Sequence, residues 1–326
     1  MKPLSIVAYF DGRLGHEKQT RGILQALAEI TATSVVHKKV LISPSIYLKN
    51  WAAYFFSYIL PSRVENKPNS VDLIMGAGTH THIPMLLDKK SRGGRSGKQQ
   101  VRVVTCMTPD VLLRNTFDLC CIPMHDEPAA DSNVFVTLGP PTTVKYEGRQ
   151  QSDRGLILVG GLDAKSHVWN SEEVITQIQV IITRNPSMHW TISSSPRTPE
   201  ETCQDLEKLA ASMRQLTFYR SQNTPDGWIE KEYGLNATVW VTADSISMVY
   251  EALSAGCSVG ILPMEWVQQD NKFQKSLAIL HEKKMIVDFY EWQSGAKMPV
   301  PPVEPFNEAM RCAREILRRW WPERLQ

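Results

Sequence analysis

Residues 239–256 read V-W-V-T-A-D-S-I-S-M-V-Y-E-A-L-S-A-G, an apolar strand that runs through a polar turn into a helix. The first N–H groups of a helix lack intrahelical partners and lie at the positive end of its dipole. A diphosphate over Ser245 and Ser247 would therefore be bound by main chain and hydroxyls together. Glu251 lies on the same helix face as Ser247, and its carboxylate can accept hydrogen bonds from ribose hydroxyls. The segment predicts a nucleotide site; the alternative is that Asp244 and Ser245 are ordinary N-cap residues and Glu251 a solvated helix position.

Short apolar runs alternate with longer amphipathic stretches along the rest of the chain. This pattern is typical of parallel strands joined by crossover helices, so the predicted fold class is α/β, with two Rossmann-like doubly wound domains that face a cleft. The first series of expected strands covers 4–10, 71–75, 101–107 and 117–122, with a helix over 16–29. The second series covers 155–159, 188–193, 216–219, 237–242 and 258–262.

The length of 326 residues exceeds the usual size of one hydrophobic core, so two domains are expected. Residues 139–154 carry glycine, two prolines and mixed polar residues without periodicity, which predicts the linker there. The expected domains are therefore 1–145 and 146–302. A last segment, 303–326, is expected to form a helix that packs back on the first domain.

The composition excludes several classes of protein. A net charge of +2 excludes a generic nucleic-acid binder, so any attraction to anions must be local. The six cysteines have no C-x-x-C pair and are interpreted as buried small hydrophobic residues in a reducing compartment. The chain starts directly on a strand-like run without a secretion signal, which predicts a cytoplasmic protein.

Glycine and polar residues directly follow several expected strands. The carboxyl ends of parallel strands meet at one edge of a sheet, where doubly wound domains bind their ligands. In the first domain the residues at these ends are Asp11, Gly12, Arg13, Gly15, His16, Gly76, Gly78, Thr79, His125 and Asp126. In the second domain they are Gly160, Gly161, Ser194, Ser195, Arg197, Asp244 and Ser245. This coincidence of position is stronger evidence for two ligand sites than any single motif.

The run Asp11-Gly12-Arg13-Leu14-Gly15-His16 places an imidazole at the expected cleft. Its glycines allow a tight turn and a close approach of a ligand to the backbone. His16 is the first candidate for a general base, because histidine accepts a proton near neutral pH. Asp11 could serve as the base instead, or could orient the imidazole. The alternative is an ordinary turn with a histidine at a helix start.

The second domain offers a cation for a phosphate. In the run 193–199, Thr198 is expected as an N-cap, with Pro199 in the first helical position and Glu201 completing a capping box. Arg197 precedes the cap, together with Ser194 and Ser195, where a guanidinium could bind a phosphate; the alternative is an exposed loop charge. Gly160 and Gly161 would let the backbone approach a diphosphate or sugar.

No metal site and no cofactor are predicted. The cluster His125-Asp126-Glu127 is adjacent on a loop, and a structural or substrate-orienting role is favoured over metal binding. No D-x-D pair occurs in the chain, so a leaving diphosphate would be neutralised by helix dipoles and cations.

Two segments suggest a peripheral contact with an anionic membrane. Residues 45–63 are rich in aromatic and aliphatic side chains, and this run is too short to span a bilayer. It could lie in the membrane interface, or it could be a helix buried against the sheet. A basic loop without intervening acids contains Lys89, Lys90, Arg92, Arg95, Lys98 and Arg102. Arg318-Arg319-Trp320-Trp321 is a weaker sign of the same kind.

Five segments together resemble one known family: D-G-R-L-G-H-E-K-Q at 11–19, G-A-G at 76–78, P-M-H-D at 123–126, R-T-P at 197–199 and V-T-A-D-S-I-S-M-V-Y-E-A at 241–252. The chain is similar to the family named after the plant mitochondrial fission factor, whose bacterial members are regarded as glycosyltransferases of the GT-B type. The resemblance covers both halves in order. It implies a GT-B fold, a sugar-nucleotide donor on the second domain and an acceptor on the first.

The function expected from these observations is metal-independent sugar transfer from a nucleotide donor, UDP-linked by preference. The acceptor is expected to be an envelope glycan or a lipid-linked molecule, with inversion at the anomeric carbon. One alternative is a nucleotide-sugar epimerase of the same fold, which would need acid and base carboxylates around the sugar. The other is a non-catalytic membrane adaptor, because a fold alone does not establish catalysis.

Overall fold

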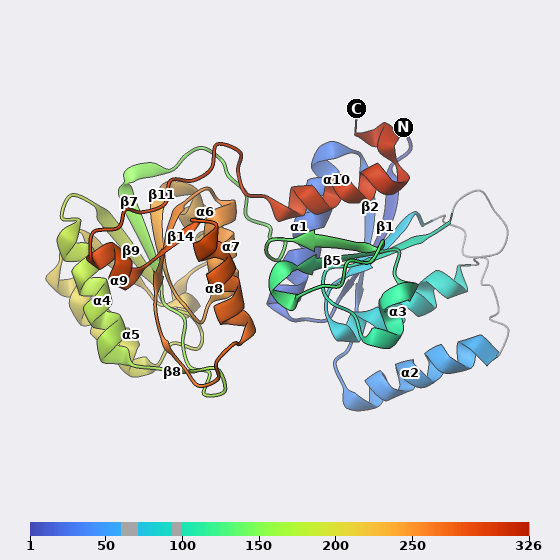
Figure 1. The fold of residues 1–326 in the computed structure, drawn as a ribbon, viewed down its shortest axis with the longest axis horizontal. Helices are drawn as coiled ribbons and strands as arrows, with labels where there is room; N and C mark the ends of the chain where they lie inside the picture. The colour runs from blue at the N-terminus through green and yellow to red at the C-terminus, as the bar shows by residue number, and fades with distance from the viewer. Residues whose placement is uncertain (60–70, 93–99, 326) are drawn as a thin grey trace. The chain divides into compact units, whose positions relative to one another are not determined.

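The computed structural model describes residues 1–59, 71–92 and 100–325, and the chain forms two compact units. Unit 1 comprises Met1–Thr143 and Asn307–Gln326, and unit 2 comprises Val144–Phe306. The chain therefore leaves unit 1 after Thr143, builds unit 2, and returns to unit 1 at Asn307 (Figure 1).

Unit 1 is built on a parallel six-stranded sheet in the order β2-β1-β3-β4-β5-β6. The strands are β1 (Leu4–Phe10), β2 (Thr33–Lys39), β3 (Leu73–Gly76), β4 (Arg102–Thr105), β5 (Leu119–Pro123) and β6 (Val134–Thr137). The helices are α1 (Leu14–Ile30), α2 (Pro44–Ile59), α3 (Thr79–Ser91) and α10 (Glu308–Trp320), with short 3-10 turns η1 (Val111–Thr116), η2 (Met124–Asp126) and η4 (Pro322–Arg324). The strand order reverses between β1 and β3, which is where doubly wound sheets bind ligands.

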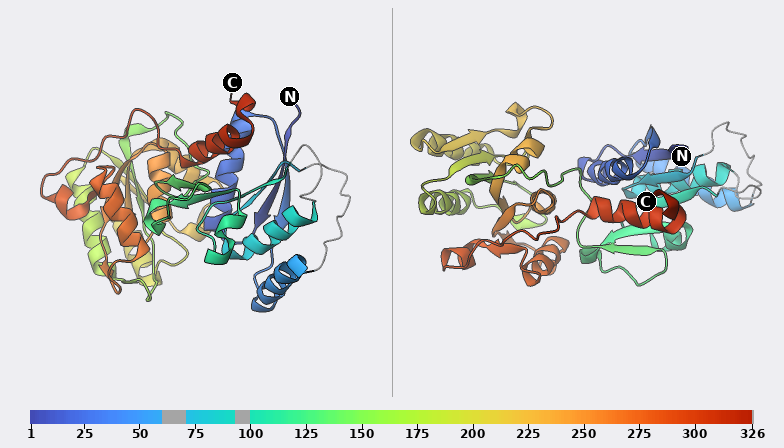
Figure 2. Two further views of the ribbon diagram at one scale, coloured as in Figure 1. Left: turned by 45° about the vertical axis from the view of Figure 1, so that its right-hand side comes forward. Right: turned by 90° about the horizontal axis from the view of Figure 1, so that it is seen from above.

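Both faces of this sheet are covered. Ile6 and Ala8 of β1 belong to the core layer under α1 and α10, whereas Val7 and Tyr9 belong to the layer under α2 and α3. Because successive side chains point to opposite faces, a strand buried on both sides reads as a continuous apolar run. Figure 2 shows α10 beside α1 in both views, and four of its apolar residues, Cys312, Ala313, Ile316 and Leu317, contribute to the same core layer.

Unit 2 repeats this architecture with the order β10-β9-β7-β11-β12-β14, also parallel. The strands are β7 (Gln151–Leu158), β9 (His189–Ser193), β10 (Leu216–Tyr219), β11 (Asn236–Thr242), β12 (Ser258–Leu262) and β14 (Ile286–Asp288). A separate antiparallel pair joins β8 (His167–Val168) to β13 (Glu265–Trp266). The order reverses between β7 and β11, so the switch point of this sheet lies between the loops that follow these two strands.

The helices of unit 2 are α4 (Ser171–Arg184), α5 (Glu200–Ser212), α6 (Trp228–Leu235), α7 (Ile246–Ser254), α8 (Lys272–Glu282) and α9 (Phe289–Gln293), with a 3-10 turn η3 (Ser221–Asn223). One core layer contains Ile178 of α4, Leu206 of α5 and Phe289 of α9, packed on Ile157 and Trp240 of the central strands. Trp190 and Trp240 are among the largest wholly buried side chains of the chain.

The α/β class and the two parallel sheets agree with the sequence prediction, which differs in several strands. The prediction missed β2, β6, β8, β13 and β14, and β7 begins at Gln151, inside the predicted linker. β2 and β14 are edge strands, and β2 has only half-buried or exposed residues, so its side chains lack the apolar run of a central strand.

Candidate functional site

The first candidate site lies in unit 1, where β1 ends and α1 begins. The side chain of Asp11 is fully buried, and its Oδ2 lies 2.8 Å from Nδ1 of His16 in the first turn of α1. The other oxygen, Oδ1, accepts a hydrogen bond of 3.1 Å from the Arg13 amide. The carboxylate therefore orients the imidazole through Nδ1, and Asp11 makes no contact with Nε2. His16 itself is about a quarter exposed, with 24% of its side chain accessible.

Gly78, after the neighbouring strand β3, completes this arrangement. Its φ of 102° is unfavourable for other residues, and a Cβ atom there would collide with Asp11 Oδ2 and His16 Nδ1. The Asp11–His16 pair is therefore packed directly on the backbone of the second loop at the switch point. Gly12 also has a positive φ, of 81°, in the turn between β1 and α1.

His82 on α3 is a buried histidine beside this pair, and sequence reasoning missed it. Its Nε2 lies 3.1 Å from the Thr105 hydroxyl, and its ring packs edge-on against Phe117. Burial, and the nearby His16, lower the pKa of His82 to about 4. His82 is thus neutral at neutral pH and adds no positive charge next to His16. No sequence signal distinguishes it, because it lies inside an unremarkable helix.

The other predicted residues of unit 1 lie on neighbouring loops. Thr79 begins α3. The Asp126 carboxylate accepts a hydrogen bond of 3.0 Å from Thr108 and lies 3.6 Å from His125 Nε2. In the part of the chain that the structure describes, no three His, Cys, Asp or Glu side chains are grouped so that they could hold a metal ion.

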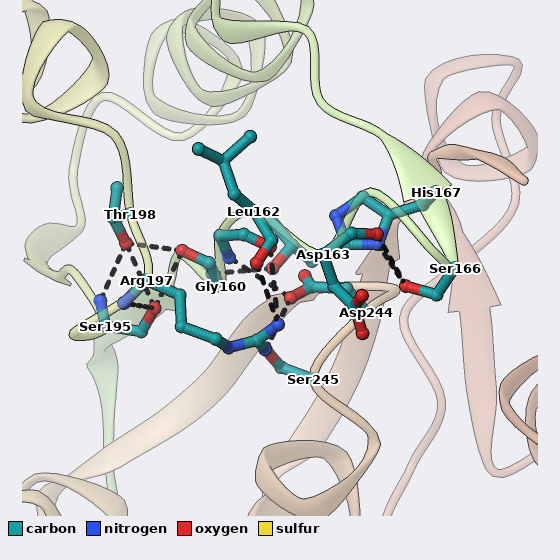
Figure 3. A network of polar contacts seen from close by, with 12 residues as sticks. Gly160, Leu162, Asp163, Ser166, His167, Ser195, Arg197, Thr198, Asp244 and Ser245 are labelled. Atoms are coloured by element: carbon teal, nitrogen blue, oxygen red, sulfur yellow. Dashed lines mark hydrogen bonds and ion pairs between the residues drawn. The ribbon is translucent and has the colours of Figure 1, made fainter.

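The second candidate site lies in unit 2, at the carboxyl ends of β7, β9 and β11, and its centre is Asp244 (Figure 3). Asp244 Oδ2 accepts hydrogen bonds from the Gly161 amide at 3.1 Å and the Ser245 hydroxyl at 3.2 Å. It also forms an ion pair with Arg197, whose Nη2 lies 3.0 Å away. Oδ1 is buried and has no hydrogen-bond partner among the described residues. One carboxylate therefore joins three loops.

Arg197 has a fixed position but keeps access to solvent. Its side chain is 47% exposed, whereas that of Asp244 is 1% exposed. Nη1 lies 3.5 Å from the carbonyls of Gly161 and Leu162, at the limit of a hydrogen bond. The guanidinium thus has donors left over for an anion.

The two glycines after β7 are required by close packing. A Cβ atom at Gly160 would collide with the Asp244 carboxylate, and one at Gly161 with the Arg197 backbone. The Gly160 amide donates to the Thr242 hydroxyl at 2.7 Å, and its carbonyl accepts from Ser195 at 2.9 Å. Thr242 was not among the predicted residues; its signal was a polar residue directly after the apolar run 239–241.

The predicted cap of α5 is wrong. The helix begins at Glu200 with Pro199 as N-cap, and no side chain caps it. The Thr198 hydroxyl instead accepts from the Ser195 amide at 2.8 Å and donates to the carbonyl of Gly160. Contacts with the neighbouring loop therefore outweigh the local capping pattern, and Thr198 belongs to the candidate site.

The remaining predicted donor residues have different environments. Ser245 is the N-cap residue of α7 without a side-chain capping bond, and Ser194 accepts a hydrogen bond of 3.0 Å from the Ser221 amide. Ser247 is exposed, but Glu251 is only 4% exposed. The Tyr233 side chain hydrogen-bonds to Glu251, and burial together with this carboxylate raises the pKa of Tyr233 well above its ordinary value. The role of Glu251 as a ribose acceptor stays a prediction.

The aromatic segment forms α2, which is partly buried against the sheet and partly exposed. Tyr54 is buried and Trp51 partly buried against the sheet, whereas Leu48, Phe55 and Phe56 are 69%, 55% and 59% exposed. Leu60 and Arg63 lie outside the described residues. No described helix is long and apolar enough to cross a membrane.

The described cations of the basic loop have protein partners. Lys89 and Arg102 pair with Asp118, and Arg92 pairs with Asp88. Lys90 donates to Ser57. Arg95 and Lys98 lie outside the described residues. The absence of acids within the loop therefore did not predict free charges, because Asp88 directly precedes the loop on α3 and Asp118 follows it in the chain.

Comparison with known proteins gives a family and a fold. A family model described as mitochondrial fission ELM1 matches residues 14–320. No curated protein matches the sequence.

Similar solved structures include a protein from Listeria monocytogenes described as a putative UDP-N-acetylglucosamine 2-epimerase. It has 13% identity and a TM-score of 0.53, and the similarity covers 97% of this chain and 95% of the other. The MnaA–UDP structure from S. aureus has 13% identity, a TM-score of 0.52, and coverage of 100% and 98%. The UDP-GlcNAc 2-epimerase of Methanocaldococcus jannaschii has 12% identity, a TM-score of 0.50, and coverage of 97% and 100%. With the two parallel sheets, these similarities show a GT-B-like fold.

Proposed function

This chain belongs to the mitochondrial fission ELM1 family, and from that premise we propose that it transfers a sugar from a UDP-linked donor to an envelope glycan or lipid-linked acceptor, with inversion and without a metal or cofactor. The observation that carries the proposal is the Asp11–His16 pair. A direct displacement needs a base for the acceptor hydroxyl, and a buried carboxylate that orients an imidazole is a recurrent way to supply one. Asp11 is the orienting group and His16 Nε2 the proton acceptor.

The donor diphosphate is assigned to unit 2. Arg197 offers the donors that Asp244 does not use, the glycine loop allows close approach of the backbone, and Ser245 and Ser247 lie at the positive end of α7. These groups would stabilise the charge of the leaving diphosphate without a divalent cation. Chelation should therefore leave activity intact, and loss of activity with rescue by manganese would contradict the metal-free assignment.

Contact with an anionic membrane is part of the proposal. Exposed Leu48, Phe55 and Phe56 on α2 would enter the interface, with Lys49 on the same helix near the headgroups. A lipid-linked acceptor would then be presented to unit 1.

The test is single-site replacement of the proposed base. His16→Ala is expected to lower turnover by roughly a hundredfold, with donor affinity unchanged, because the base acts on the acceptor and not on the nucleotide. Turnover can be followed as release of UDP from a panel of UDP-sugars, and donor affinity by calorimetry. His189→Ala is the matched control, since His189 is an exposed histidine of unit 2. Loss of donor binding at full turnover would make His16 a ligand contact.

A second candidate function is epimerisation of a UDP-sugar, which is supported by the fold similarity to UDP-GlcNAc 2-epimerases. It predicts inversion at C2 of UDP-GlcNAc in the absence of any acceptor, which proton NMR detects directly. If the protein binds none of the nucleotide sugars, the adaptor alternative is favoured instead.

A further inference from the structure

A pocket on unit 1, away from the loops described above, is lined by one face of α10. Arg311, Arg314 and Arg318 are three and four residues apart, so their side chains lie on one side of the helix. With Glu315 they line an open pocket of about 530 Å³. Its other walls are apolar and come from Ile30, Phe135 and Leu325.

The charges in this pocket are unbalanced. Arg311 Nη1 lies 2.7 Å from both oxygens of Glu308, and Arg318 forms two bonds of 2.8 Å to Glu315. Glu315 also accepts from Arg319. Arg314 is exposed and has no hydrogen-bond or ion-pair partner within residues 1–59, 71–92 and 100–325. The pocket thus presents a guanidinium with all its donors available, between two whose orientation is fixed by acids.

The apolar walls remain available to a ligand. Leu325 is 39% exposed, and Ile30 and Phe135 are only partly buried at the edge of the unit 1 core. The Arg311 guanidinium carbon lies 5.0 Å from the centre of the Phe135 ring, a cation–π contact that holds this side chain against the wall. The site therefore combines anion donors with an apolar surface.

We propose that this pocket binds a phosphate monoester carried on an apolar body, with Arg314 as its principal contact. A phosphate offers three acceptor oxygens, so it can accept from the Arg314 fork and from the N–H groups of Arg311 or Arg318 that the acids leave unused. The apolar body would cover Ile30, Phe135 and Leu325. The inference is independent of the proposed function, because it requires neither a nucleotide donor nor sugar transfer.

The experiment is titration calorimetry of the full chain with three probes: inorganic phosphate, phenyl phosphate and dihexanoyl phosphatidic acid below its micelle concentration. The two organic phosphates are expected to bind at least about tenfold more tightly than inorganic phosphate, because only they bury apolar surface. The ranking of the two separates a soluble phosphate ester from a lipid as the natural source. Arg314→Ala should weaken both about tenfold, since it removes charge-assisted hydrogen bonds.

Three further variants make the result decisive. Arg214→Ala, at an exposed arginine of unit 2, should bind like the wild type. Arg314→Lys should fall between wild type and alanine, because it keeps the charge and loses the fork. Leu325→Ser should weaken the organic phosphates and leave inorganic phosphate unchanged. Equal affinity for all three probes, unchanged binding by Arg314→Ala, or no binding by the folded wild type would each overturn the proposal.

Discussion

Gly160 has no room for a side chain, because a Cβ atom there would collide with the Asp244 carboxylate. We expect Gly160→Ala to displace Asp244 from Arg197, to weaken donor binding and to destabilise unit 2 by about 1–3 kcal/mol, as overpacking of a close contact does. Calorimetric titration with UDP and thermal unfolding measure the two effects. Gly15→Ala is the control, since a Cβ atom there meets nothing within 4 Å and its unfolding temperature should be unchanged or slightly higher. Donor affinity equal to wild type in Gly160→Ala would remove this loop from the site.

His82 makes unit 1 sensitive to acid. Its pKa is about 4 in the folded chain and 6.5 in the reference state, so between these values only the unfolded chain binds the proton. Stability therefore rises with pH in this window and is lost as the pH falls from about 6.5 towards 4, by up to about 1.4 kcal/mol per pH unit. Between pH 6 and pH 5 the free energy of unfolding, measured in urea, should fall by about 1 kcal/mol less in His82→Gln than in the wild type. His189→Gln is the control and should follow wild type; identical acid sensitivity in His82→Gln would refute the assignment.

The pairing of Asp11 with His16 could be predicted from the sequence, since the two residues are only five positions apart, at the end of β1 and the start of α1. The network around Asp244 could not. Asp244, Arg197 and Gly161 follow three different strands, and only the sheet order brings their loops together. A sequence pattern identifies which residues follow strands, but not which of them pair, because pairing depends on the registration of whole strands.

At the scale of elements, α2 carries the exposed apolar side chains of Leu48, Phe55 and Phe56. We expect the protein to sediment with anionic vesicles. Phe55→Ser should weaken this binding about tenfold, because the variant lacks the phenyl ring that would be transferred from water into the membrane interface. Liposome sedimentation at low and high salt is the measurement. Salt should have a modest effect, since the described cations of the basic loop are paired within unit 1.

The control for this prediction is Leu112→Ser, which removes an exposed apolar side chain that lies on η1 rather than α2. It should sediment like the wild type. If the wild type stays in the supernatant with anionic vesicles at low salt, α2 does not dock on membranes and a soluble acceptor is favoured.

Central strands were predictable because burial on both faces gives them continuous apolar runs, as in residues 6–10 of β1 and 239–241 of β11. The edge strands β2 and β14 were missed, since β2 is partly exposed and β14 has only three residues. The cap of α5 was mispredicted for a different reason. The signal at Thr198 is local, and the contact of its hydroxyl with the Gly160 loop is tertiary.

At the scale of the whole molecule, two units with separate cores should respond separately to a ligand. UDP is expected to raise the unfolding temperature of unit 2 and to leave the transition of unit 1 unchanged. At a hundredfold excess of UDP over Kd, the free energy of unfolding of unit 2 should rise by about 2.7 kcal/mol. Differential scanning calorimetry resolves the two transitions. Glu251→Gln should reduce the shift if this carboxylate accepts from ribose. A shift confined to unit 1 would contradict the assignment of the donor.

The return of the chain to unit 1 has a consequence for its synthesis. Ala309, Cys312, Ala313, Ile316 and Leu317 of α10 close a core layer whose other buried members are made before unit 2. At ordinary translation rates the intervening residues 144–306 occupy the ribosome for roughly ten to thirty seconds. During that time unit 2 can fold as a contiguous segment, whereas the nascent first unit exposes the apolar groove that α10 later fills. Unit 1, most of which is made before unit 2, is thus completed only after it.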